Sequence, residues 1–202
     1  MQNRQLSKTI RRAVGNPKFA MRVLLGYAKG HALKLRCRLT GQRLIGGKAL
    51  CIFGRLDIRG PGVVQIGHGV IIDMRVTAWT HARDAKITIG DHCFVNGTRF
   101  GCAMEITVGR DSILAEAHIM DTDFHSTAVN RWSPDAEVRV RPVRLADNVW
   151  IAANAGLLPG TTIGKNSVVG FGAVCSGTYP ENSIIAGNPA RVVKAIVEDV
   201  KS

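Results

Sequence analysis

The sequence predicts an all-β solenoid, because its most regular stretch repeats every six residues. Five consecutive units from Leu145 begin with an aliphatic residue and carry a small or β-branched residue at the fifth place, and a weaker sixth unit contains Tyr179. A period of six fits neither an α-helix nor a simple alternating strand. Short internal repeats are typical of solenoids, and three sides of six residues make one triangular turn. We therefore expect the aliphatic residues to stack inside the coil and the small residues to lie near its corners.

The same phase can be followed upstream of the regular stretch. Short strands with glycine turns begin near Leu50, so we place the solenoid domain at residues 50–184. The step from Ile89 to Val108 is one residue longer than three six-residue units. This predicts a bulge between Gly101 and Glu105.

The repeat is interrupted once, directly after His125. Residues 126–144 are mostly polar and predict a loop that projects from one corner of the coil. Inserted loops in solenoids often carry binding function. The basic and aromatic side chains of the loop either grip an anionic acceptor or are simply solvated, and both readings stay open: Arg131, Trp132, Arg139 and Arg141.

Residues 185–202 predict a short helix and a tail. Val193, Ile196 and Val197 would form the apolar side of that helix. It would cover the end of the coil, where strand edges are otherwise exposed.

The N-terminal segment, residues 1–49, is predicted to be a basic helical module. Residues 1–50 contain twelve lysines and arginines and no acidic residue, so the formal charge of +12 belongs entirely to this part of the chain. Apolar residues from Leu6 to Val14 fit a first helix. A second helix spans about 17–36, with Asn16 as its N-cap and proline at its first position.

The charge of this module suggests an anionic partner. Residues 1–36 could make peripheral contact with an anionic membrane, or the helix could pack on the end of the coil with its charges solvated. No motif supports nucleic acid. Five cysteines without metal-type spacing favour a reduced, cytoplasmic setting, and no transmembrane run or signal peptide is recognised.

The repeats, the run Asp147–Ile151 and the ending Ala186–Arg191 resemble the hexapeptide-repeat acyltransferases. Within that family, residues 50–197 are similar to sugar O-acetyltransferases such as the galactoside and maltose acetyltransferases. The resemblance implies a left-handed parallel β-helix and a homotrimer with active sites between subunits. It also implies acetyl-CoA as acyl donor and no metal.

The resemblance also implies roles for single residues. His125 would be the general base that takes the proton from an acceptor hydroxyl, as a neutral imidazole can. Asn96 would orient that hydroxyl, and the backbone N–H of Ala153 would stabilise the oxyanion. The cofactor-binding residues would be Trp150, Ala152, Gly170, Gly172, Arg191 and Lys194. The acceptor would be contacted by Asp123, Arg131 and Trp132.

Each role has a structural alternative. Trp150 could anchor a subunit interface, and Asn96 could bridge corners of the coil. Asp121 and Asp123 could orient His125 or simply turn the chain, and we favour the turn. Two departures from the family pattern are visible. Ser176–Thr178 replaces a lysine-containing run that would contact a CoA phosphate, and the basic segment replaces the family's usual N-terminal module.

We expect an O-acetyltransferase that acts on a sugar or a lipid-linked glycan in surface-polysaccharide or lipopolysaccharide synthesis. The alternative with the same base is N-acetylation of a nucleotide-linked amino sugar. A trimeric zinc enzyme of the carbonic-anhydrase kind is less well supported, because the spacing of His118 and His125 is out of register with that family. A non-catalytic scaffold would lack a reason for His125, Asn96, Trp150 and Arg191 to occur together.

Overall fold

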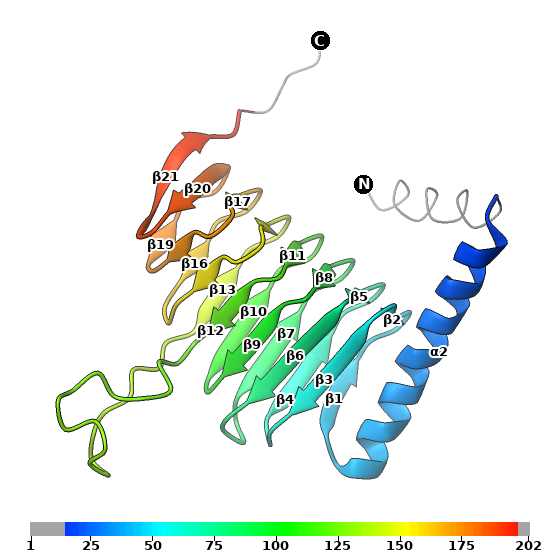
Figure 1. The fold of residues 1–202 in the computed structure, drawn as a ribbon, viewed down its shortest axis with the longest axis horizontal. Helices are drawn as coiled ribbons and strands as arrows, with labels where there is room; N and C mark the ends of the chain where they lie inside the picture. Colours follow the sequence, from blue (N-terminus) through cyan, green and yellow to red (C-terminus); the bar gives the residue numbers. More distant parts are fainter. Residues whose placement is uncertain (1–14, 198–202) are drawn as a thin grey trace.

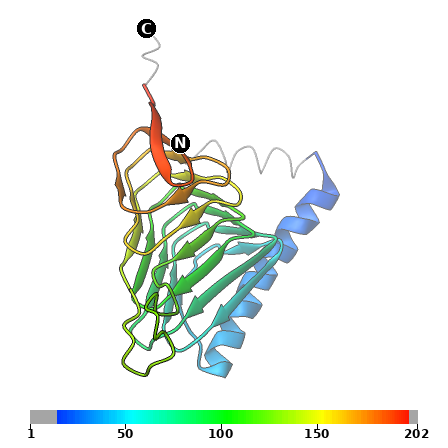
Figure 2. The same ribbon diagram turned by 60° about the vertical axis from the view of Figure 1, so that its left-hand side comes forward.

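The chain winds into a three-sided coil in which every third strand joins the same sheet (Figure 1 and Figure 2). The computed structural model describes residues 15–197, so the expected first helix from Leu6 to Val14 lies outside the described residues. The architecture is the left-handed parallel β-helix that the family resemblance implies.

Three parallel sheets, here named A, B and C, form the three sides of the coil. Sheet A contains, in order, β1 (Arg43–Gly46), β4 (Val63–Ile66), β7 (Lys86–Ile89), β10 (Glu105–Val108), β13 (Val143–Leu145), β16 (Thr162–Ile163) and β19 (Thr178–Tyr179). Sheet B contains β2 (Cys51–Ile52), β5 (Ile71–Asp73), β8 (Phe94–Asn96), β11 (Ile113–Ala115), β14 (Trp150–Ile151), β17 (Val168–Val169), β20 (Ser183–Gly187) and β21 (Ala190–Ala195). Sheet C contains β3 (Arg55–Arg59), β6 (Arg75–Thr80), β9 (Arg99–Cys102), β12 (His118–Met120), β15 (Gly156–Leu157) and β18 (Val174–Cys175).

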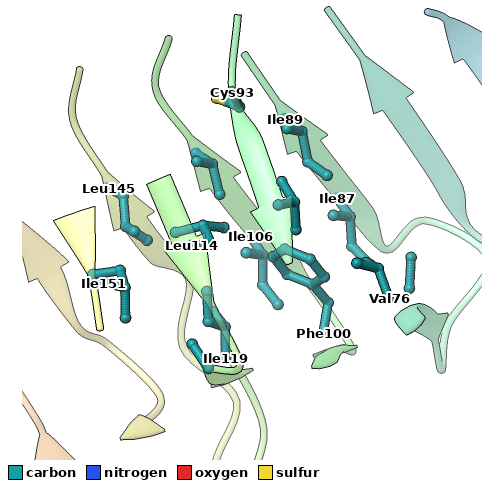
Figure 3. Close-up of a cluster of buried hydrophobic side chains, with 14 of the residues drawn as sticks. Val76, Ile87, Ile89, Cys93, Phe100, Ile106, Leu114, Ile119, Leu145 and Ile151 are labelled. Atoms are coloured by element: carbon teal, nitrogen blue, oxygen red, sulfur yellow. The ribbon is translucent and has the colours of Figure 1, made fainter. Parts of the chain in front are cut away.

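The core is a column of side chains stacked from turn to turn, as Figure 3 shows for Leu114, Ile151 and their neighbours. The first residues of the regular units are at most 2% exposed: Leu145, Ile151, Leu157, Ile163, Val169 and Cys175. The fifth residues are at most 7% exposed: Val149, Ala155, Thr161, Ser167, Ala173 and Tyr179. Burial of one large aliphatic side chain contributes about 1.5–3 kcal/mol. The predicted roles of both positions are therefore confirmed.

The corner between sheets A and B is formed by residues with left-handed backbone conformations. Asn148, Asn166 and Asn182 have φ values of 56°, 58° and 55°. Asparagine tolerates this conformation better than most residues. The side chains form a ladder, because Asn148 Nδ2 donates to Asn166 Oδ1 and Asn166 Nδ2 donates to Asn182 Oδ1, each at 2.9 Å. Successive turns of the coil are thus bonded at the corner as well as along the strands.

Helix α2 (Pro17–Thr40) covers the N-terminal end of the coil, beside β1 and β2 (Figure 1). Asn16 caps it as predicted, because its side chain accepts a hydrogen bond from the Phe19 N–H at 3.1 Å. The helix runs beyond residue 36 and ends at Gly41, whose φ is +73°. Strand β1 starts directly afterwards, so the coil begins within the segment assigned to the N-terminal module.

Gly26 and Gly30 give α2 its packing face. A Cβ atom at Gly30 would lie 2.2 Å from the Leu50 carbonyl oxygen, and one at Gly26 would lie 2.5 Å from Cys51 Sγ. With Leu33 and Cys37, they are the buried residues of the helix. The helix axis can therefore lie close to the first turn of the coil.

The expected C-terminal helix is wrong, because the structure has a strand in its place. Strand β21 (Ala190–Ala195) turns back after Gly187 and pairs antiparallel with β20. Val192 and Val193 are β-branched and suit a strand, and the free edge of β20 supplies hydrogen-bond partners that an isolated helix would not use.

Candidate active site

Asp121 builds the corner from which the long loop departs. Its side chain is fully buried and accepts hydrogen bonds from the backbone N–H groups of Ala103, Met104 and Glu105 at 2.7, 2.8 and 2.7 Å. A buried carboxylate needs such donors to offset the loss of water. Asp121 therefore turns the chain and holds the predicted bulge, and no bond to His125 is among its contacts in the described structure.

Phe124 then fixes the residue next to the candidate base. Its φ is 61°, and its ring covers Gly101 so closely that a Cβ atom there would lie 2.5 Å from the ring tip. The ring meets His81 edge to face with a centroid distance of 4.8 Å, and His81 meets Trp79 at 4.6 Å. Sequence reasoning missed this aromatic cluster, because Phe124 lies two turns farther along the coil than Trp79 and His81.

His125 follows at the corner between sheets C and A and is exposed. Its backbone N–H donates to the Asp123 carbonyl at 2.7 Å. Within residues 15–197, neither imidazole nitrogen has a hydrogen-bond partner, and the nearest ring is Trp132 at a centroid distance of 6.2 Å. Both ring nitrogens are thus available to a substrate.

The loop brings two of the predicted acceptor-binding residues beside His125. A hollow of about 250 Å³ is lined by His125, Ser126, Arg131 and Trp132. Trp132 is 87% exposed. A flat exposed aromatic side chain with a neighbouring guanidinium suits a polar ring-shaped ligand.

The base of this loop is closed by Asp123 and Arg139. The Arg139 guanidinium donates to both carboxylate oxygens of Asp123, at 3.0 and 3.2 Å. Thr122 and Val140 form an antiparallel bridge beside this pair. Asp123 therefore holds the loop in this structure, and its predicted contact with the acceptor stays a prediction.

Asn96 lies at the corner between sheets B and C, where β8 ends and the chain turns toward β9. Its Oδ1 atom is buried and has no hydrogen-bond partner among residues 15–197. An unsatisfied buried carbonyl typically costs about 1–3 kcal/mol and calls for an explanation. A ligand hydroxyl, or a donor from a second subunit, would satisfy it.

Ala153 and Gly172 lie at the same corner as Asn96, two and three turns farther along the coil. Gly172 donates its N–H to the Ala153 carbonyl at 3.0 Å, whereas the Ala153 N–H has no acceptor within the described part of the chain. Gly172 has a φ of +66°, and a Cβ atom there would meet nothing within 4 Å. The corner thus offers a free N–H beside open space.

The remaining cofactor candidates continue along sheet B. Trp150 is 48% exposed on β14. The Ala152 N–H is bonded to Val169 and that of Gly170 to Ile185, so neither N–H is available to a ligand. Arg191 and Lys194 are exposed on β21, the last strand of the same sheet. These candidates therefore lie along one path, here called the cofactor track, which runs from Ala153 over sheet B to β21.

The buried cysteines are not candidate nucleophiles. Burial raises the pKa of Cys93 to about 12 and that of Cys175 to about 11, and it also raises the pKa of Cys102. A thiol reacts as its thiolate. These three therefore stay protonated at neutral pH. No three histidine, cysteine or acidic side chains within residues 15–197 are grouped to hold a metal.

The regular stretch also matches a known family model. Residues 142–177 match the family model described as bacterial transferase hexapeptide (six repeats). An Escherichia coli protein named as a lipopolysaccharide biosynthesis O-acetyl transferase, WbbJ, is 29% identical over 71% of this chain and 78% of that protein. The chain carries the hexapeptide repeats of bacterial transferases and is similar to a protein named as an O-acetyl transferase.

Solved structures share the fold of this chain. A mutant of the N-acyltransferase AntD from Bacillus cereus, in complex with dTDP-4-amino-4,6-dideoxyglucose and coenzyme A, has a TM-score of 0.68 at 22% identity and covers 81% of this chain and 90% of that chain. A hexapeptide-repeat containing acetyltransferase from Vibrio cholerae, complexed with acetyl coenzyme A, has a TM-score of 0.54 at 22% identity and covers 77% and 72%.

Proposed function

We propose that the acyltransferase moves an acetyl group from acetyl-CoA to a sugar hydroxyl during assembly of a bacterial surface polysaccharide or lipopolysaccharide. The named role of WbbJ in lipopolysaccharide biosynthesis supports this acceptor class. The acetyl coenzyme A bound to the Vibrio cholerae enzyme supports the donor. The acceptor we favour is a lipid-linked glycan, which would bring the enzyme to the cytoplasmic side of the inner membrane.

One observation carries the proposal: the two corners that bound sheet C carry groups that would serve as complementary halves of an acyl-transfer site. One corner carries His125, whose ring nitrogens have no partner among residues 15–197. The other carries the unsatisfied Asn96 Oδ1 and, farther along, the free Ala153 N–H. A base, a group that orients the nucleophile and an oxyanion donor are what acyl transfer requires.

The halves are separated by the width of a sheet within one chain, because β9 and its neighbours lie between the two corners. We propose a cyclic homotrimer in which His125 of one subunit faces Asn96 and Ala153 of the next. Cyclic interfaces pair different surface patches of identical subunits. Sheet C would then face the neighbouring subunits.

The proposed reaction needs no covalent enzyme intermediate. His125 accepts the proton of the sugar hydroxyl while the hydroxyl oxygen attacks the thioester carbonyl carbon, and the new C–O bond places negative charge on the carbonyl oxygen near the Ala153 N–H. The C–S bond then breaks, and the proton passes from His125 to the departing thiolate. A neutral imidazole suits this role, because it can accept a proton from a hydroxyl group.

The donor would lie along the track on sheet B. Trp150, Ala152, Gly170 and Gly172 would contact the thioester arm, and Arg191 with Lys194 would pair with its phosphates. Arg131 and Trp132 would contact the acceptor beside His125, with Asp123 completing that side of the site.

N-acetylation of a nucleotide-linked amino sugar is the second candidate. AntD is described as an N-acyltransferase in complex with such a sugar nucleotide. The same base and donor would serve this reaction. A panel of sugar alcohols and amino sugars, assayed for CoA release, distinguishes the two functions by the acceptor that supports turnover.

Replacement of His125 tests the proposed chemistry. We expect His125→Ala to lower CoA release by about 10²–10⁴-fold, because a positioned general base contributes that much. Subunit number and CoA affinity should be unchanged, since the exposed side chain makes no hydrogen bond within the described structure. Light scattering and calorimetry measure these two controls.

His68→Ala is the matched control, because His68 is an exposed histidine at the corner between sheets A and B, away from sheet C and its proposed subunit contacts. The acyltransferase should keep its activity in this variant. Turnover that survives His125→Ala would remove the proposed base.

A further inference from the structure

Helix α2 presents an apolar stripe on the side opposite to its packing face. The packing face consists of Gly26, Gly30, Leu33 and Cys37. At about 100° per residue, side chains three or four positions apart lie on the same face of a helix. Apolar residues at this spacing gather on the face opposite to the glycines. Its five large members are between 55% and 79% exposed: Met21, Leu24, Leu25, Leu35 and Leu39.

Such a stripe is unusual on a helix that already packs against its own domain. An amphipathic helix of a globular protein normally points its apolar residues to the core and its charges outward. Here the glycines occupy the core-facing side and the leucines face outward. Contiguous exposed apolar surface of this kind marks an interaction site.

Basic residues border the stripe on both sides. Lys18, Arg22, Lys29 and Arg36 fall on one border of the helical wheel, and His31, Lys34 and Arg38 fall on the other. Arg22 pairs with Asp73 at 3.5 Å and Lys29 donates to the Phe53 carbonyl, so the first border is partly engaged with the coil. The helix contains no acidic residue, and Asp57 is the first one in the chain.

We propose that this face of α2 docks on an anionic phospholipid surface, with the helix axis parallel to the bilayer. An apolar stripe between two cationic borders is the arrangement of helices that lie in the membrane interface. The leucines would enter the boundary between headgroups and acyl chains, and the borders would meet the lipid phosphates. No helix within residues 15–197 is long and apolar enough to cross a bilayer.

Charge favours a membrane over a second copy of the helix as the occupant. Two copies of this face would bring like-charged borders together, which costs stability. An anionic leaflet would instead attract every border residue. The position of α2 at one end of the coil, opposite to β20 and β21, leaves the cofactor track free (Figure 1).

Vesicle cosedimentation of the full chain tests this inference. We expect binding to vesicles of phosphatidylcholine with phosphatidylglycerol, little binding to phosphatidylcholine alone, and weaker binding at high salt because exposed charges are screened. Replacing Leu24, Leu35 and Leu39 together with glutamine should lower the partition constant at least about tenfold. Each replacement removes apolar surface that would be buried in the membrane interface. All three side chains are exposed, so the coil should fold normally.

Two controls separate this face from general stickiness. Val197→Gln removes an apolar side chain that is 83% exposed at the other end of the described chain. Arg59→Gln with Lys165→Gln removes two exposed charges elsewhere, whereas Lys18→Gln, Arg36→Gln and Arg38→Gln together neutralise the borders. The control variants should bind like the wild type, and the border variant should bind more weakly.

Two outcomes would overturn the inference. The first is equal binding of the wild type and the triple leucine variant, or no binding to anionic vesicles. The second is a change in subunit number with the leucine variant, measured by light scattering, which would assign the face to contact between copies. Turnover with a soluble acceptor should be unchanged throughout, so failure here is distinguishable from failure of the proposed acetyl transfer.

Discussion

At the scale of single residues, Phe124 positions the turn that carries His125. A bulky residue rarely adopts a φ of 61°, and this conformation costs on the order of 1–3 kcal/mol. Packing of its ring on Gly101 and His81 offsets that cost. His125 is the next residue, so its position depends on where the Phe124 ring lies.

Gly101→Ala tests this dependence. The added methyl group would displace the ring tip, and we expect kcat to fall about tenfold or more, as small misplacements of catalytic groups do. The KM for acetyl-CoA should hold, because the proposed donor track lies on another sheet. The loss of stability should be modest, about 1 kcal/mol, because only a side chain must move.

Phe124→Leu combined with Gly101→Ala shortens the ring and should recover part of kcat. A drop in thermal stability without a change in kcat would show that Phe124 has no positioning role.

The sequence predicts His125, Asn96 and Ala153 through the repeat and the family resemblance, but it does not reveal their surroundings. The Asp121 hydrogen bonds join residues 16 to 18 positions apart, at a corner lengthened by one residue. A strict six-residue period cannot anticipate which side chain fills that corner.

At the scale of elements, Asp57 ties strand β3 to strand β6. It is 5% exposed and accepts hydrogen bonds from Arg55 at 2.5 Å and from Arg75 at 2.8 Å. Burial alone would raise the pKa of this carboxyl, but the two guanidinium groups outweigh burial and hold the pKa below its usual value.

Because the folded-state pKa of Asp57 is lowered, its ion pairs stabilise the fold above the unfolded-state pKa of about 3.9. This stabilisation is lost as the pH falls through the lower folded-state pKa. We therefore expect Asp57→Asn to destabilise the protein by about 1–3 kcal/mol near neutral pH. The difference from the wild type should narrow as the pH approaches and passes below about 4. Thermal unfolding at a series of pH values measures it.

Asp84→Asn is the matched control, since Asp84 is exposed and no ion pair or hydrogen bond of its side chain is found among residues 15–197. Its unfolding should follow the wild type at every pH. If the stability difference between Asp57→Asn and the wild type stayed constant across the pH series, the ion pairs of Asp57 would not be the cause of that difference.

The elements show what periodicity alone can decide. The regular hexads fix the buried residues of β13 to β19, because each side of the coil repeats the same contacts. The segment Val192–Val197 is too short for its apolar spacing to separate helix from strand, and the free edge of β20 decides the outcome. For α2, the packing glycines face Leu50 and Cys51, and no local pattern predicts that contact.

At the scale of the whole molecule, the placement of His125 and Asn96 on opposite edges of sheet C predicts complementation between inactive subunits. Asn96→Ala and His125→Ala subunits, coexpressed with different tags, should form mixed trimers. With equal and random mixing in a cyclic assembly, about one site in four combines an intact His125 from one subunit with an intact Asn96 from the next. CoA release should therefore exceed that of either parent by a wide margin.

Each parent variant purified alone is the control for residual turnover. Mixed assemblies that release CoA no faster than the parents would place His125 and Asn96 in separate functions. The family resemblance predicts a shared site, but one chain cannot show it, because the three-sided coil keeps its corners apart.

The reversal of direction at β21 has a consequence for self-association. A parallel coil with a bare end could extend indefinitely, since the last turn of one molecule offers the same hydrogen bonds as the first turn of another. An antiparallel strand on sheet B and a helix over the first turn make both ends unlike the middle. The end of sheet B therefore does not offer the parallel pairing of the middle turns, which opposes head-to-tail stacking of molecules into fibres.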